Sequence, residues 1–146
     1  MQKKLFFFIV IVFTVTVTVE LYAQQGSHAI VGKWWTGDKS AKVEIARCGS
    51  DYCGTLIWIK DDNQKDAPLL DTKNSNPALR SRPLKGLVIL RRLHFDGNKW
   101  IGGLVYDPQE GQEYTCTISL TQDGQLELRG YVGLPMFGRS EYWVKE

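Results

Sequence analysis

The sequence predicts an all-β fold: an eight-stranded antiparallel meander that closes into a barrel. Two observations predict this fold. Apolar and polar residues alternate with a period of two over most of the chain, and short runs rich in Gly, Asp, Asn and Pro separate the alternating segments. Parallel strands need connections of about a dozen residues or more, so strands joined by such short turns must pair as antiparallel hairpins.

The first 23 residues have the layout of a secretory signal peptide rather than of a strand. Lys3 and Lys4 give a basic start, a continuous apolar run follows, and cleavage after Ala23 fits the small-residue rule. The alternative is a transmembrane anchor, but a span needs about twenty apolar residues, and residues 5–19 are interrupted by three threonines. We therefore expect a cleaved signal over 1–23, an exported protein (periplasmic or secreted) without an integral membrane anchor, and one mature domain over 24–146.

Eight segments carry the strand pattern. In the second, Ala41, Val43 and Ile45 alternate with Lys42 and Glu44. The expected strands lie near 31–36, 41–48, 53–60, 86–95, 99–106, 112–120, 125–132 and 137–145. An even number lets the first and last strands pair antiparallel, which closes the barrel around side chains or one small ligand. A two-sheet sandwich is the alternative.

One connection, residues 61–85, is too long for a hairpin turn. It contains three prolines and no strand alternation, and loops of this length are usually functional or disordered. A single helical turn is expected over Asn76 to Arg80, with Asn76 as cap and Pro77 at its start. We expect the loop to lie over or beside one barrel mouth, with Arg80 and Arg82 near the entrance. The leucines that would need burial there are Leu69, Leu70, Leu79 and Leu84.

Export changes how the three cysteines are interpreted. Cys48 and Cys53 flank a four-residue turn-forming run, so in an oxidising compartment we expect them to form a disulfide. Cys116 has apolar neighbours on its own strand face and is expected to be a buried, inert thiol. A metal site is not expected, because only His28 and His94 remain as partners and neither has ligand spacing.

The net charge of +2 hides an uneven distribution. Residues 72–92 contain six Lys and Arg residues and no acid, whereas the rest of the mature chain is net acidic. Such a segment could attract an anionic ligand, a lipid head group or a partner. Alternatively, its arginines pair with the acids just upstream, which are Asp61, Asp62, Asp66 and Asp71. We expect no nucleic-acid partner, since the protein is exported and has no recognisable base-stacking platform.

Catalytic patterns are scarce, so we do not expect an enzyme, and no cofactor is implied. The sequence has no Gly-x-Ser-x-Gly, no phosphate-binding loop and no metal-spaced cluster. The candidate ligand-binding residues are polar or cationic side chains of the long loop and two tryptophans: Arg80, Arg82, Asp71, Asn74, Trp58 and Trp100. Asp71 and Asn74 are also residue types that stabilise turns, and tryptophans also fill barrel interiors.

Several strings together resemble one family. They are GKWW at 32–35, CGSDYCG at 48–54, DTKNSNPALRSRPLKG at 71–86, GGLVYDPQEGQEY at 102–114 and RGYVGLPMFGRSEYW at 129–143. They are similar to bacterial exported proteins grouped as domain-of-unknown-function family 2147. The resemblance covers essentially the whole mature chain and implies a bacterial, exported context without a mechanism.

A second resemblance is to lipocalin-like (calycin) barrels. These begin with Gly-x-Trp on the first strand and often carry an arginine late in the last strand, packed over that tryptophan. Gly32-Lys33-Trp34 and Arg139 match these positions, so the resemblance implies structural roles for Trp34 and Arg139. The long central loop departs from the usual lipocalin layout.

Three functions follow as hypotheses. The first is an exported barrel that binds a small or amphipathic molecule. The basic segment would suit a molecule with an anionic end. The second is a non-catalytic interaction module that docks an envelope partner through its basic loop. The third is a hydrolase-type enzyme. The sequence does not indicate an oligomeric state.

Overall fold

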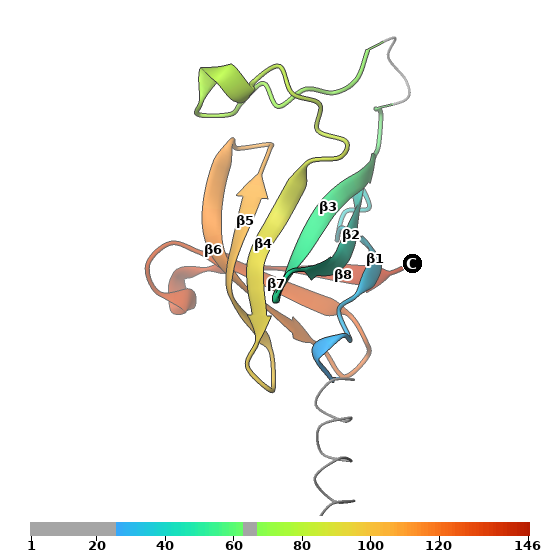
Figure 1. The fold of residues 1–146 in the computed structure, drawn as a ribbon, viewed down its shortest axis with the longest axis vertical. Helices are drawn as coiled ribbons and strands as arrows, with labels where there is room; N and C mark the ends of the chain where they lie inside the picture. Colours follow the sequence, from blue (N-terminus) through green and yellow to red (C-terminus); the bar gives the residue numbers. More distant parts are fainter. Residues whose placement is uncertain (1–25, 63–66) are drawn as a thin grey trace, which may run out of the picture.

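The computed structural model describes residues 26–62 and 67–146, and within them eight strands form one closed antiparallel barrel (Figure 1). The strands are β1 (Gly32–Trp35), β2 (Ala41–Cys48), β3 (Asp51–Ile59), β4 (Val88–Phe95), β5 (Trp100–Asp107), β6 (Gln112–Leu120), β7 (Leu126–Tyr131) and β8 (Arg139–Lys145). Two short 3-10 turns, η1 (Pro77–Leu79) and η2 (Pro135–Phe137), lie in loops. The expected all-β meander is confirmed, and the sandwich alternative is wrong. The expected signal peptide lies outside the described residues.

Each strand pairs with its neighbour in sequence, and β1 also pairs with β8, where Trp34 lies opposite Lys145. Residues on one face of each strand line the interior. In β2, for example, Ala41, Val43 and Ile45 are buried. The largest fully buried side chains are aromatic: Trp34, Trp100, Trp143 and Tyr52. The alternation seen in the sequence is therefore the inside–outside alternation of a barrel wall.

The two ends of the barrel differ. In an antiparallel meander, alternate connections lie at the same end, so the β1–β2, β3–β4, β5–β6 and β7–β8 loops share what we call the loop end. The other end is packed by residues 26–31, and we call it the closed end. There the Trp34 indole N–H donates to the Ile30 carbonyl at 2.8 Å, and the Trp100 indole N–H donates to the Ser27 carbonyl at 3.1 Å. Ile30 is fully buried against the core.

The cysteines behave as the sequence predicts. Cys48 and Cys53 form a disulfide across the β2–β3 hairpin, and Cys116 is a buried free thiol on β6. Burial raises the pKa of the Cys116 thiol to about 12, so at neutral pH the sulfur is protonated and a poor nucleophile. No helix in the described part of the chain is long and apolar enough to cross a membrane.

Candidate functional site

The described part of the long β3–β4 loop is built around a buried carboxylate. Asp71 is fully buried, and its Oδ2 accepts hydrogen bonds from Asn74 Nδ2 at 2.8 Å and from Arg82 Nε at 2.9 Å. Its other oxygen accepts the Tyr106 O–H at 2.5 Å. A second Arg82 nitrogen lies 2.9 Å from Oδ2, which makes this an ion pair. Since a carboxylate has about four lone-pair sites, these donors account for most of its capacity. We call Asp71, Asn74, Arg82 and Tyr106 the Asp71 network.

Local sequence explains why the loop takes this shape. Asn76 caps η1 by accepting the Ala78 N–H at 3.0 Å, and Pro77 opens the turn, so the expected helical turn is confirmed. The Asn74 side-chain oxygen accepts the Asn76 N–H at 2.9 Å, and Arg80 Nε donates to the Asn74 carbonyl at 2.7 Å. A backbone hydrogen bond from Asp71 N–H to the Arg82 carbonyl, at 3.0 Å, joins the two arms of the loop.

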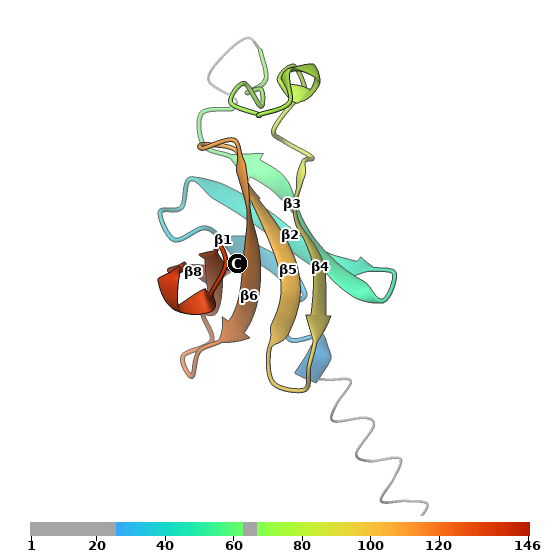
Figure 2. The same cartoon turned by 90° about the vertical axis from the view of Figure 1, so that its left-hand side faces the viewer.

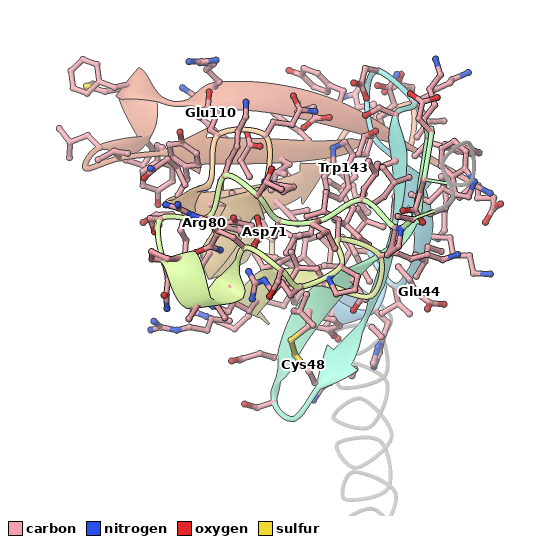
Figure 3. All side chains as sticks on the ribbon, turned by 90° about the horizontal axis from the view of Figure 1, so that it is seen from above. Glu44, Cys48, Asp71, Arg80, Glu110 and Trp143 are labelled. Carbon is pink, nitrogen blue, oxygen red and sulfur yellow. A yellow bond between two sulfur atoms is a disulfide. The ribbon has the colours of Figure 1, made fainter. Side chains whose placement is uncertain are left out.

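The loop rests against the β5–β6 hairpin at the loop end of the barrel (Figures 1 and 3). Tyr106 near the end of β5 is one contact, and Gly111 at the hairpin turn is another. A Cβ on Gly111 would lie 1.9 Å from the Lys73 carbonyl oxygen, and its φ is +70°. Only glycine therefore allows the two backbones to approach so closely with this conformation.

The loop is not held as the sequence suggested. Leu70 and Leu79 are exposed, and Leu69 and Leu84 are only half-buried, whereas Asp71 and Asn74 are buried. The expectation that leucine burial fixes the loop is wrong, because polar contacts take that role. The Arg82 guanidinium forms an ion pair with Asp71, and it also lies over the Tyr106 ring, 5.6 Å from the ring centre. Arg80 is exposed beyond its single bond to Asn74.

Burial of the Tyr106 phenol, reinforced by its hydrogen bond to Asp71, raises the pKa of Tyr106 above its ordinary value. The phenol therefore remains a donor to the carboxylate at any physiological pH. The Asp71 network unites three of the predicted site residues, which are Asp71, Asn74 and Arg82, while Arg80 adjoins it through Asn74.

A second polar arrangement follows the inner face of β8. Trp143 lies opposite Leu126 and is 2 % exposed, yet its indole Nε1 has no hydrogen-bond partner among the described residues. Glu141 lies on β8 two residues before Trp143, toward the loop end, and its side chain accepts the Gly37 N–H at 3.0 Å. Arg139 lies two residues before Glu141 and opposite Gly130 of β7. It is exposed and forms no ion pair within the described residues. Strand alternation places all three on one face.

Trp34 and Arg139 do not meet, so the predicted cation–π contact between them is wrong. The first and last strands are neighbours as expected, but their register sets Lys145 opposite Trp34. The Lys145 ammonium lies 5.4 Å from the centre of the Trp34 ring. Arg139 is six residues earlier on β8, which is about 20 Å away at the rise of a strand. Lys145 takes the cationic position that the lipocalin resemblance assigned to Arg139.

The other two predicted site tryptophans lie apart from the Asp71 network. Trp58 on β3 packs edge-on against Trp35 of β1, with ring centres 5.3 Å apart. Lys42 lies over the Trp35 ring. Its neighbours on β2, Ala41 and Val43, are buried inside the barrel, so Lys42 points outward. Trp35 and Trp58 therefore lie on the outer face of the barrel. Trp100 is buried at the closed end against Phe95 and Tyr52. The structure therefore does not bring Trp58 or Trp100 near the loop arginines.

Sequence reasoning missed two residues that complete these arrangements. Tyr106 is separated from Asp71 by 35 positions, and nothing in its local pattern distinguishes it from other strand tyrosines. Trp143 could have been singled out, because a tryptophan in the middle of a half-polar strand needs a partner for its N–H. No group of three or more His, Cys, Asp or Glu side chains in residues 26–62 and 67–146 is arranged to hold a metal ion.

Comparison with known proteins agrees with this architecture. Residues 32–145 match the family described as "Uncharacterized protein conserved in bacteria (DUF2147)". Among solved structures, the chain is similar to protein HP1028 from Helicobacter pylori, described as belonging to the lipocalin family. The TM-score is 0.71 at 26 % identity, over 80 % of this chain and 82 % of that one. No curated protein matches the sequence.

Proposed function

This chain belongs to the bacterial DUF2147 family, and we propose that it is an exported, non-catalytic protein that binds a small amphipathic molecule in its barrel. A lipocalin-like barrel supports binding as the general role. The Cys48–Cys53 disulfide supports export to the periplasm or beyond, since such bonds persist in oxidising compartments.

The inner face of β8 carries the proposal. Among the residues that the structure describes, it changes from a buried indole N–H without a partner, at Trp143, to an exposed guanidinium without an ion pair, at Arg139. A buried donor without an acceptor costs about 1–3 kcal/mol, which an acceptor on a ligand would remove. A guanidinium at the rim is a fork-shaped donor suited to a carboxylate or phosphate. The bound molecule would then place its apolar body inside and its anionic end near Arg139.

The exposed Arg80 adds positive charge at the same end of the barrel and is a further candidate contact for the anionic group. Arg82 serves a ligand less directly, because its charge is already paired with Asp71. A variant that removes Arg82 would therefore disturb the loop as well as any binding, and Arg80→Gln is the cleaner test of the loop's contribution.

The test compares two probes with the same apolar chain, dodecanoate and dodecanol, by quenching of tryptophan fluorescence. Loss of a hydrogen bond to a charged group costs about 1.5–3 kcal/mol, so Arg139→Gln should weaken dodecanoate binding by roughly 10- to 100-fold and leave dodecanol unchanged. Neither probe has an acceptor along its apolar chain, so Trp143→Phe, which removes the indole N–H and one ring, should affect both probes equally and serves to separate packing effects from the contact at Arg139.

The matched control is Arg92→Gln, because Arg92 is an exposed arginine on β4 without an ion pair within the described residues. It should bind both probes as the parent protein does. Equal loss in Arg92→Gln and Arg139→Gln would indicate a non-specific charge effect. Failure of either probe to bind the parent protein would refute this ligand class.

A further inference from the structure

The loop between β7 and β8 exposes an unusual amount of apolar side chain. Its residues Val132, Leu134, Met136 and Phe137 are 74 %, 59 %, 72 % and 77 % exposed. Figures 1 and 2 show the segment projecting from the side of the barrel, with η2 at its tip. Single exposed apolar residues need no explanation, but four in one short loop mark a surface that binds something. We call residues 132–138 the apolar loop.

The apolar loop is braced by specific contacts. Arg129 on β7 donates to the Pro135 carbonyl at 2.8 Å, to the Met136 carbonyl at 3.4 Å and to Ser140 Oγ at 3.0 Å. Backbone hydrogen bonds close η2, and a Cβ on Gly138 would lie 2.5 Å from the Gly130 carbonyl oxygen. These contacts fix the loop backbone relative to β7 and β8 while its apolar side chains are exposed to solvent.

The charged residues within and directly beside the apolar loop in the sequence are arginines. Residues 129–140 contain Arg129 and Arg139 and no acid. Apolar side chains flanked by arginine are the pattern of a segment that enters the interface of a membrane carrying anionic lipids.

We propose that the apolar loop inserts into the surface of a lipid bilayer that contains anionic head groups. The main alternative occupant is a second copy of the chain. A stable protein interface buries about 800 Å² per partner and involves about 20–30 residues a side. Four side chains on a projecting tip are much less than that, whereas a bilayer accepts a narrow apolar projection and needs no matching surface.

The experiment is sedimentation of the mature protein with vesicles of phosphatidylcholine, alone or mixed equally with phosphatidylglycerol. The parent protein should bind the mixed vesicles, bind phosphatidylcholine weakly, and dissociate partly as salt rises, because surface charge is screened. Replacing two of the four apolar side chains, as Met136→Ser with Phe137→Ser, should lower binding to mixed vesicles by roughly tenfold or more. Phe137→Leu, which keeps an apolar tip, should retain binding.

The matched control is Val88→Ser with Val144→Ser, which removes two exposed apolar side chains from strands outside the loop. The control should bind mixed vesicles as the parent does. Absence of parent binding to mixed vesicles, or equal loss in the control, would overturn the proposal. So would a concentration-dependent dimer in light scattering that the Met136→Ser, Phe137→Ser variant abolishes, because the occupant would then be a second copy. None of these outcomes bears on Trp143, so the proposed ligand site is tested separately.

Discussion

Asp71→Asn tests whether polar contacts, rather than leucine burial, hold the long loop. The substitution keeps the size and shape of the side chain but removes the charge that pairs with Arg82. It also replaces one acceptor oxygen with an amide that repels a donor. Asp71 is fully buried, so the orphaned donors cannot simply turn to water at that position.

The expected magnitude follows from the burial of the two partners. Breaking a fully buried ion pair costs about 3–5 kcal/mol. Here the Arg82 side chain is 34 % exposed and can recover part of its hydration, so we expect about 2–3 kcal/mol. This cost should be expressed mainly as local opening of the loop, since the strand pairing that closes the barrel does not involve Asp71.

Limited proteolysis with trypsin measures that opening directly. Within residues 67–85 trypsin can cleave after Lys73, Arg80 and Lys85, while Pro83 blocks cleavage after Arg82. When opening is fast relative to cleavage, the rate follows the open population, so Asp71→Asn should accelerate cleavage roughly 30- to 150-fold. Glu44→Gln, the same acid-to-amide change at an exposed position on β2, should cleave at the parent rate. Parent-like cleavage of Asp71→Asn would refute the view that the Asp71 network closes the loop.

Two further predictions concern positions where packing is tight. Gly111→Ala should open the same loop from the opposite side, because its Cβ would overlap the Lys73 carbonyl, and the same trypsin assay should show faster cleavage in that variant. Cys116, whose pKa is raised to about 12 by burial, should react with Ellman's reagent only slowly at about pH 8 in the folded protein and rapidly in guanidinium, releasing one equivalent per chain. Fast labelling of the folded protein would show that the β6 interior is open to reagent.

The strands could be predicted from sequence because a barrel wall separates core from solvent at every residue. Val43 and Ile45 are buried for the same reason that Lys42 and Glu44 between them are polar. The Cys48–Cys53 bond could be predicted because its geometry is local, across one short hairpin. The cap at Asn76 could be predicted for the same reason, since its partner Ala78 is two residues away.

The parts that sequence did not predict depend on register and on distant partners. Whether Arg139 or Lys145 reaches Trp34 is decided by how far β8 is shifted along β1, and both residues are cations on the same strand. The Asp71–Tyr106 contact joins a loop to a strand 35 positions away, and no local pattern encodes it. Counting leucines overestimated apolar packing, because a buried carboxylate with three kinds of donor can fix a loop as well as a hydrophobic cluster.

The two ends of the barrel differ in how the N–H groups of their buried tryptophans are satisfied. At the closed end, Trp34 and Trp100 are fully buried, and the indole N–H of each donates a hydrogen bond to a backbone carbonyl. Within the described residues, Trp143 is as deeply buried but lacks that partner, and Arg139 on the same strand face forms no ion pair. Of the three fully buried tryptophans in the described part of the chain, Trp143 is the one whose indole N–H has no partner. Since folding alone would favour pairing all three, the difference supports placing the proposed ligand along β8 rather than among the closed-end aromatics.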